Sequence, residues 1–132
     1  MKALTLHPWW AWLVVHGHKP TENRSWSPPA GIVGSMLAIH AGVRRASATD
    51  RDLLRGQLNA AGVPHLLDAA MAAPRGRIVG TVRVVEVDGR CTSPWDIDGL
   101  QHWRLADAAV LDGPTLPGRL GIWTWDQPEG AR

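Results

Sequence analysis

The segment that decides this fold is Gly17-His18-Lys19-Pro20-Thr21-Glu22-Asn23-Arg24-Ser25-Trp26, which follows an apolar stretch. If the segment is extended, side chains two residues apart share a face, so Glu22, Arg24 and Trp26 point the same way. An anion, a cation and an aromatic ring on one face suit a small planar polar ligand such as a nucleobase. The alternative interpretation is a solvated strand with one exposed Glu22–Arg24 ion pair, which contributes little to stability.

A strand and a helix are predicted before this segment. Residues 2–6 alternate polar and apolar and predict a short strand. Pro8 suits the first helical position, where its missing N–H leaves no bond unmade, and Gly17 is a typical helix end. The helix between them is nearly all apolar, so we expect it to be buried on most sides. Its tryptophans are therefore expected in the core; they are Trp9, Trp10 and Trp12.

Further strands are predicted downstream, from runs of β-branched and apolar residues bounded by turn residues. They cover residues 35–41, 77–87, 101–111 and 120–125. Between the first two, Thr49 with Asp52 is expected to cap a helix that ends near residue 60, and Pro64 opens a second helix over 65–72. Strands with one helical insertion predict an α+β fold, a small mixed β-barrel with a short N-terminal helix.

Composition is that of a globular domain. The 132 residues are 45% hydrophobic and 20% charged, and the formal net charge is +2. Residues 1–60 hold seven Lys/Arg and three Asp/Glu, a balance of +4. This charge permits a nucleic-acid partner without requiring one, since domains built for non-specific nucleic-acid affinity are usually more basic. Eight tryptophans and no tyrosine or phenylalanine leave every aromatic role to tryptophan.

Several classes of protein are not expected. The single cysteine excludes an internal disulfide and a cysteine-based zinc site, and the histidines lack a carboxylate at ligand spacing, so we expect no metal and no cofactor. The chain has no signal-peptide pattern and no run of about 18 apolar residues, which predicts a cytoplasmic protein without membrane contact. One domain is expected over residues 1–126, followed by a frayed tail over 127–132.

Three polar groups outside the charged segment have two interpretations each. His40 lies where a predicted strand meets a loop, and it is either a ligand contact or a hydrogen-bonded part of the scaffold. Arg44, with its neighbour Arg45, is either a phosphate contact or solvated. Asp96 and Asp98 are either an acid–base pair or part of a polar loop.

Taken in order, these motifs resemble the ASCH domain family, which has the PUA-like β-barrel fold. The resemblance covers nearly the whole chain and is loosest over 47–74. One departure is His7, where many members of the family have glutamine. The residues that carry the resemblance are Pro8-Trp9, Gly17-x-Lys19-x-x-Glu22-x-Arg24-Ser25-Trp26, Ile39-His40-Ala41, Gly80-Thr81-Val82, His102-Trp103-Arg104-Leu105-Ala106-Asp107 and Gly118-Arg119-Leu120-Gly121-Ile122-Trp123.

The resemblance implies a cleft beside the barrel that is lined by the charged segment and takes RNA, DNA or a modified nucleoside. Some small members are amidohydrolases that remove an acyl group from the exocyclic nitrogen of cytidine, with a lysine and a threonine three residues later. Here Lys19 is present but Glu22 occupies the threonine position, which puts that nucleophile in doubt. Other members have been linked to ribonuclease activity.

Our first hypothesis is a module that binds RNA, single-stranded DNA or a modified nucleoside. Lys19 and Arg24 would contact phosphate or base carbonyl groups, and Glu22 would accept a hydrogen bond from an exocyclic amine. Trp26 or Trp103 would stack on the base. The candidate ligand-binding residues are Lys19, Glu22, Arg24, Ser25, Trp26, His40, Arg44 and Trp103.

Two other hypotheses remain open. In a hydrolase, Lys19 and Glu22 would be the catalytic pair that activates water for attack on an amide or a phosphodiester. In a protein-interaction module, Glu22 and Arg24 would instead be architectural. Exposed tryptophans could also form a dimer contact.

Overall fold

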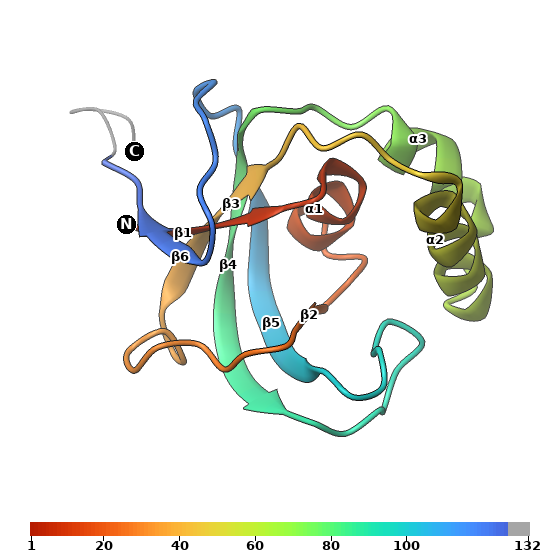
Figure 1. Cartoon of the computed structure of the whole chain (residues 1–132), viewed down its shortest axis with the longest axis horizontal. Coiled ribbons are helices and arrows are strands. Elements are labelled where there is room, and N and C mark those ends of the chain that lie inside the picture. The colour runs from red at the N-terminus through yellow and green to blue at the C-terminus, as the bar shows by residue number, and fades with distance from the viewer. Residues whose placement is uncertain (127–132) are drawn as a thin grey trace.

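The computed structural model describes residues 1–126, in which six strands form one curled mixed sheet (Figure 1). The order across the sheet is β2-β5-β4-β3-β1-β6. The strands are β1 (Lys2–Leu6), β2 (Thr21–Arg24), β3 (Met36–Ala41), β4 (Arg77–Asp88), β5 (Gln101–Val110) and β6 (Ile122–Thr124). Irregularities of register in β3 and β4 bend the strands, as β-bulges do, and the sheet curls into half a barrel.

Strands β1 and β3 form the parallel pair of the sheet, and the other pairings are antiparallel. Because the two strands run the same way, Leu6 and Ala41 lie opposite each other at their carboxyl ends. The chain leaves β3 at Ala41 and enters β4 at its register partner Arg77. Residues 42–76 therefore form an excursion that leaves and rejoins the sheet at one place.

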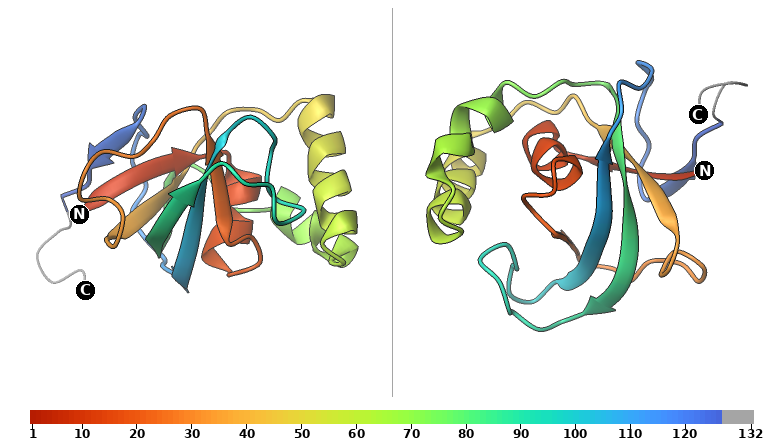
Figure 2. Two further views of the ribbon diagram at one scale, coloured as in Figure 1. Left: turned by 90° about the horizontal axis from the view of Figure 1, so that it is seen from below. Right: turned by 180° about the vertical axis from the view of Figure 1, so that it is seen from behind.

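Helix α1 (Pro8–Val15) lies inside the curl of the sheet (Figures 1 and 2). Pro8 occupies its first turn, His7 caps it by accepting a hydrogen bond from Trp9 N, and Gly17 follows its end with φ of +78°. One side of α1 packs on the sheet through Ala11, Val14 and Val15. The other side packs on the helical excursion, which explains why the helix is apolar all round.

The excursion contains α2 (Ala48–Ala60), the 3₁₀ turn η1 (Pro64–Leu66) and α3 (Leu67–Met71). Figure 2 shows α2 and α3 on the far side of α1 from the sheet. They meet α1 in a second apolar cluster. Its buried members are Trp9, Leu13, Leu54, Leu58, Ala70 and Trp95.

The predicted α+β architecture is confirmed, and three local predictions are corrected. Helix α2 is capped by Ser47 and Asp50, two residues before the predicted pair, because each side chain bonds the backbone N–H of the other in a capping box. The last strand is shorter than predicted, and Leu120 is 99% exposed. Of the three helix tryptophans only Trp9 is buried.

The predicted tail, residues 127–132, lies outside the described part of the chain. Among the helices formed by residues 1–126, none has the length and apolar character that crossing a membrane requires.

Candidate functional site

Three charged side chains form a connected row: Lys19, which lies just before β2, and Glu22 and Arg24 within it. The two-residue period of β2 places Glu22 and Arg24 on one face, as predicted, but the strand ends before Trp26, the third residue predicted on that face. Arg24 Nε donates to Glu22 Oε2 over 3.1 Å. Lys19 Nζ lies 3.4 Å from Glu22 Oε1 and also donates to the carbonyl oxygen of Thr21 over 2.6 Å. The carboxylate of Glu22 is therefore held between two cations.

Lys19 is the most enclosed of the three, with 2% of its side chain exposed. Burial lowers the pKa of its ammonium group, and the negative charge of Glu22 partly opposes that shift. Glu22 remains 12% exposed and Arg24 24% exposed. The row thus runs from a buried lysine to an arginine that reaches solvent.

Two adjoining hollows lie along this row. The smaller hollow has a volume of about 210 Å³ and includes Lys19 and Glu22 in its lining. The larger hollow has a volume of about 670 Å³ and includes Arg24. Because both are lined by Leu6, His7 and Arg44, they share a wall; we call the two together the cleft.

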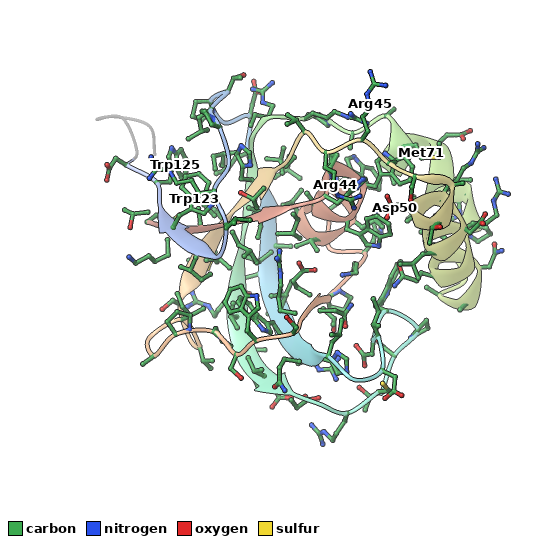
Figure 3. All side chains as sticks on the ribbon, viewed as in Figure 1. Arg44, Arg45, Asp50, Met71, Trp123 and Trp125 are labelled. Carbon is green, nitrogen blue, oxygen red and sulfur yellow. The ribbon has the colours of Figure 1, made fainter. Side chains whose placement is uncertain are left out.

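The cleft opens at the carboxyl ends of the parallel strands β1 and β3. The chain leaves β1 through Leu6 into His7, and it leaves β3 through Ala41 into the segment that carries Arg44. Figure 3 shows Arg44 close to Asp50 of α2, with Arg45 pointing away from the body of the protein. Arg44 NH1 lies 3.1 Å from Asp50 Oδ2, and these two residues of the excursion both line the smaller hollow.

His7 stands in the wall between the two hollows. Its Nδ1 accepts the hydrogen bond of Trp9 N over 3.3 Å, so in the neutral ring the proton is on Nε2. Burial, followed by the positive charge of Arg44, lowers the pKa of His7 to about 4 and keeps the ring neutral near pH 7. Nε2 is buried and finds no acceptor within residues 1–126. A buried donor without a partner is unusual, and the indole Nε1 of Trp9 is the other such group among residues 1–126.

His40 lines the larger hollow, but both of its ring nitrogens are engaged. Its Nε2 donates to the carbonyl oxygen of Leu116 over 2.7 Å, and its Nδ1 accepts from the hydroxyl of Thr5 over 3.3 Å. The same hydroxyl oxygen accepts from Trp123 Nε1 over 3.2 Å. His40 therefore fixes the loop that closes the larger hollow, which favours the scaffold interpretation.

The two tryptophans predicted to stack on a ligand pack on each other instead. Trp103 is 0% exposed, and Trp26 meets it edge to face with ring centroids 5.1 Å apart. Both belong to the cluster between sheet and α1, and neither lines the cleft. Ser25 is exposed and also lies outside the lining.

Trp10 is the aromatic ring of the smaller hollow, and the sequence interpretation had placed it in the core. Its Nε1 donates to Gln57 Oε1 of α2 over 2.8 Å. A half-buried tryptophan needs a partner for its N–H, but the sequence carries no sign that this partner lies 47 residues away. Three other lining residues were not predicted either, because tertiary contacts and not their neighbours in the sequence bring them to the cleft. They are His7, Gln57 and Arg119.

A second network joins β2 to β5 and to the loop between β4 and β5, and two of its members, Asn23 and Ile97, also line the smaller hollow. Asn23 Oδ1 accepts from His102 Nδ1 and from Ile97 N, and its Nδ2 donates to the carbonyl oxygen of Trp95. Arg104 donates to Asp88 and Asp96, and these bonds stabilise the loop between β4 and β5.

Asp96 belongs to this supporting network. Its side chain is 0% exposed, and besides Arg104 it accepts from the backbone N–H groups of Thr92 and Ser93. Burial tends to raise its pKa, but the bonds from Arg104 and the backbone outweigh this and lower the pKa to about 2. Asp98 is exposed, so the structure favours the polar-loop interpretation of these two aspartates. Within residues 1–126 no group of three or more His, Cys, Asp or Glu side chains is placed to hold a metal ion.

Comparison with known proteins places the chain in a family. A sequence model described as the ASCH domain matches residues 4–107. The crystal structure of ASCH from Zymomonas mobilis has a TM-score of 0.60 at 13% identity, over 97% of this chain and 88% of that chain. Two point mutants of the same Zymomonas mobilis protein match at 12% identity. One has a TM-score of 0.60 and covers 96% of this chain and 87% of its own. The other has a TM-score of 0.58 and covers 96% of this chain and 89% of its own. At such identities the likeness shows the fold alone. No curated protein matches the sequence.

Proposed function

Because the chain belongs to the ASCH domain family, we propose that it binds nucleic acid or a modified nucleoside by enclosing one base in the smaller hollow. The observation that carries this proposal is the position of Glu22, whose carboxylate is fixed by Lys19 and Arg24 in the lining of that hollow. A fixed carboxylate is an acceptor for an exocyclic amine, as it is for cytosine N4.

The size of the smaller hollow supports one base as its occupant. Its volume of about 210 Å³ lies below the range of roughly 300–1,000 Å³ usual for pockets that enclose whole drug-sized ligands. The indole of Trp10 supplies an aromatic surface in its lining. Stacking of a base on such a ring contributes about 1–3 kcal/mol in single-stranded nucleic-acid complexes.

The donors beside Glu22 favour a cytosine-type edge. Lys19 has three ammonium protons, and the contacts to Thr21 and Glu22 use two of them. His7 lines both hollows, and its buried Nε2–H has no partner within residues 1–126. A base with an amine next to a ring nitrogen and a carbonyl group would donate to the carboxylate and accept from these groups.

The experiment is a titration of fluorescently labelled single-stranded oligonucleotides, followed by anisotropy at low salt. We expect oligo-C to bind more tightly than oligo-U, and Trp10→Leu to weaken oligo-C binding by about 1–3 kcal/mol. Trp12→Leu is the matched control, because Trp12 lies on the same helix but lines a different pocket. Absence of binding up to high micromolar protein, or equal losses in the two variants, would contradict the proposal.

Hydrolysis is a second candidate, favoured by the lowered pKa of Lys19 beside Glu22. A lysine that loses its proton more readily than usual can act as a general base or nucleophile. Incubation with N4-acetylcytidine and with RNA, followed by mass spectrometry, tests this candidate. Turnover that is lost in Lys19→Met would support it, and turnover unchanged in Lys19→Met would exclude Lys19 from catalysis.

A further inference from the structure

The two hollows of the cleft differ in charge. The smaller hollow is lined by charged groups of both signs, from Lys19, Glu22, Arg44 and Asp50. The charged residues that line the larger hollow are all arginines, and no aspartate or glutamate is among them. They are Arg24, Arg44 and Arg119. A concave surface lined by one sign of charge attracts ligand groups of the other sign.

The three arginines are not equally engaged. Arg24 donates to Glu22 and to the carbonyl oxygen of Thr5. Arg44 is 64% exposed and paired with Asp50. Arg119 is exposed and forms no side-chain hydrogen bond or ion pair within residues 1–126.

The loop that carries Arg119 is nevertheless fixed. Leu116 N bonds the carbonyl oxygen of Gly76 over 3.0 Å, and the Leu116 carbonyl oxygen accepts from His40. At Gly118 an added Cβ would lie 2.6 Å from Thr5 Oγ1 and 2.8 Å from His40 Nδ1, so the backbone touches the wall of the hollow. The guanidinium of Arg119 therefore extends from an anchored backbone.

We propose that the larger hollow is a phosphate subsite, so that the ligand is a nucleotide with a phosphate beside its base rather than a free nucleoside. This inference rests on the proposed function, because the base is assigned to the smaller hollow. The shared wall of Leu6, His7 and Arg44 places the two hollows next to each other, as one nucleotide requires. Arginine binds phosphate oxygens through paired N–H donors.

The phosphate could belong to a mononucleotide or to a nucleotide within a chain. Affinity is measured by competition against the labelled oligonucleotide, with cytidine, 5′-CMP, 3′-CMP and oligo-C as competitors. We expect at least one phosphorylated form to bind about tenfold or more tightly than cytidine. Oligo-C that competes better than both mononucleotides identifies a nucleotide within a chain; equal competition identifies the mononucleotide.

The decisive variant is Arg119→Gln, with Arg45→Gln as its control. Both substitutions remove one exposed positive charge, but Arg45 points away from the protein and lines neither hollow (Figure 3). We expect Arg119→Gln to abolish most of the preference for the phosphorylated ligand. The slope of log affinity against log salt concentration should also fall by about one, as for the loss of one phosphate contact. Arg119→Lys should recover part of that preference.

Two results would overturn the inference while leaving the proposed function in place. One is cytidine binding as tightly as both forms of CMP and oligo-C; the other is the same preference in Arg119→Gln as in Arg45→Gln. If neither cytidine nor any phosphorylated ligand binds, the proposed function fails and the phosphate subsite fails with it.

Discussion

Glu22 and Arg24 project from one face of β2, with Arg24 Nε 3.1 Å from Glu22 Oε2, and this contact joins the two hollows of the cleft. The pair is partly shielded from water, with exposed fractions of 12% and 24%. It therefore contributes more to the structure than a fully solvated pair would.

Glu22→Gln removes the negative charge while keeping the shape of the side chain. Lys19 would lose its counter-charge in a buried place, so we expect the free energy of unfolding to fall by about 1–3 kcal/mol. Urea unfolding followed by tryptophan fluorescence measures the change. Glu86→Gln is the control, because its ion pair with Arg90 is largely exposed and its loss should change stability by less than about 0.5 kcal/mol. Equal effects would show that the carboxylate of Glu22 has no special structural role.

Gly118→Ala tests how tightly the loop is held against the wall of the larger hollow. The new Cβ would overlap Thr5 Oγ1 and His40 Nδ1, so we expect a loss of about 1–3 kcal/mol in stability and weaker binding of phosphorylated ligands. The control is Gly56→Ala inside α2, where an added Cβ meets nothing within 4 Å. That substitution should stabilise the protein by roughly 0.5–1 kcal/mol, since alanine favours helix more than glycine does. A Gly118→Ala variant as stable as the parent would contradict the close approach.

The acid response of the fold should depend on His7. The pKa of His7 is about 4 in the folded protein and about 6.5 in an unfolded chain. Above pH 6.5 the ring is neutral in both states. As the pH falls from 6.5 to 4, the unfolded chain takes up a proton that the folded protein excludes, so stability declines across this window.

His7→Asn is the variant that tests this response, since asparagine keeps a side-chain acceptor for Trp9 N but does not titrate. We expect the melting temperature of the parent to fall more steeply between pH 6.5 and 4 than that of His7→Asn. The pKa of His16 is also lowered, but His16 is present in both proteins and cancels in the comparison. If the melting temperatures of the two proteins fell equally between pH 6.5 and 4, this result would contradict a buried, neutral His7.

Asp96→Ala tests the network that joins β2 to the loop between β4 and β5. Arg104 would lose one of its two carboxylate partners, and two backbone N–H groups would lose their acceptor, so we expect a loss of at least about 3 kcal/mol. Thermal unfolding measures it. Asp98→Ala in the same loop is the control and should have little effect, because Asp98 is exposed. Similar melting temperatures for the two variants would show that the loop does not depend on Asp96.

Patterns that depend on neighbouring residues were predicted from the sequence. The shared face of Glu22 and Arg24 follows from the two-residue period of a strand, and the limits of α1 follow from Pro8 and Gly17. The cap of α2 was misplaced because two Ser/Thr residues compete there, and only Ser47 completes the reciprocal bonds with Asp50.

The lining of the cleft was only partly predictable. Lys19, Glu22, Arg24 and Arg44 were selected from local charge and do line it. Trp103 was selected as a stacking platform, but the sequence does not say that Trp26 and α1 cover it. Arg119 carries no local signal, because it joins the larger hollow only through the bonds that hold its loop to His40 and Gly76.

The return of residues 42–76 to their starting point, with Ala41 opposite Arg77, makes this excursion exchangeable. It supplies Asp50, Leu53 and Gln57 to the smaller hollow but contributes no strand to the sheet. A different excursion could be inserted between the same two partners if it also covers the outer side of α1, which Leu54, Leu58 and Ala70 bury here. Replacement of this one segment would then change part of the lining of the smaller hollow, while Lys19, Glu22 and Arg24 keep their positions.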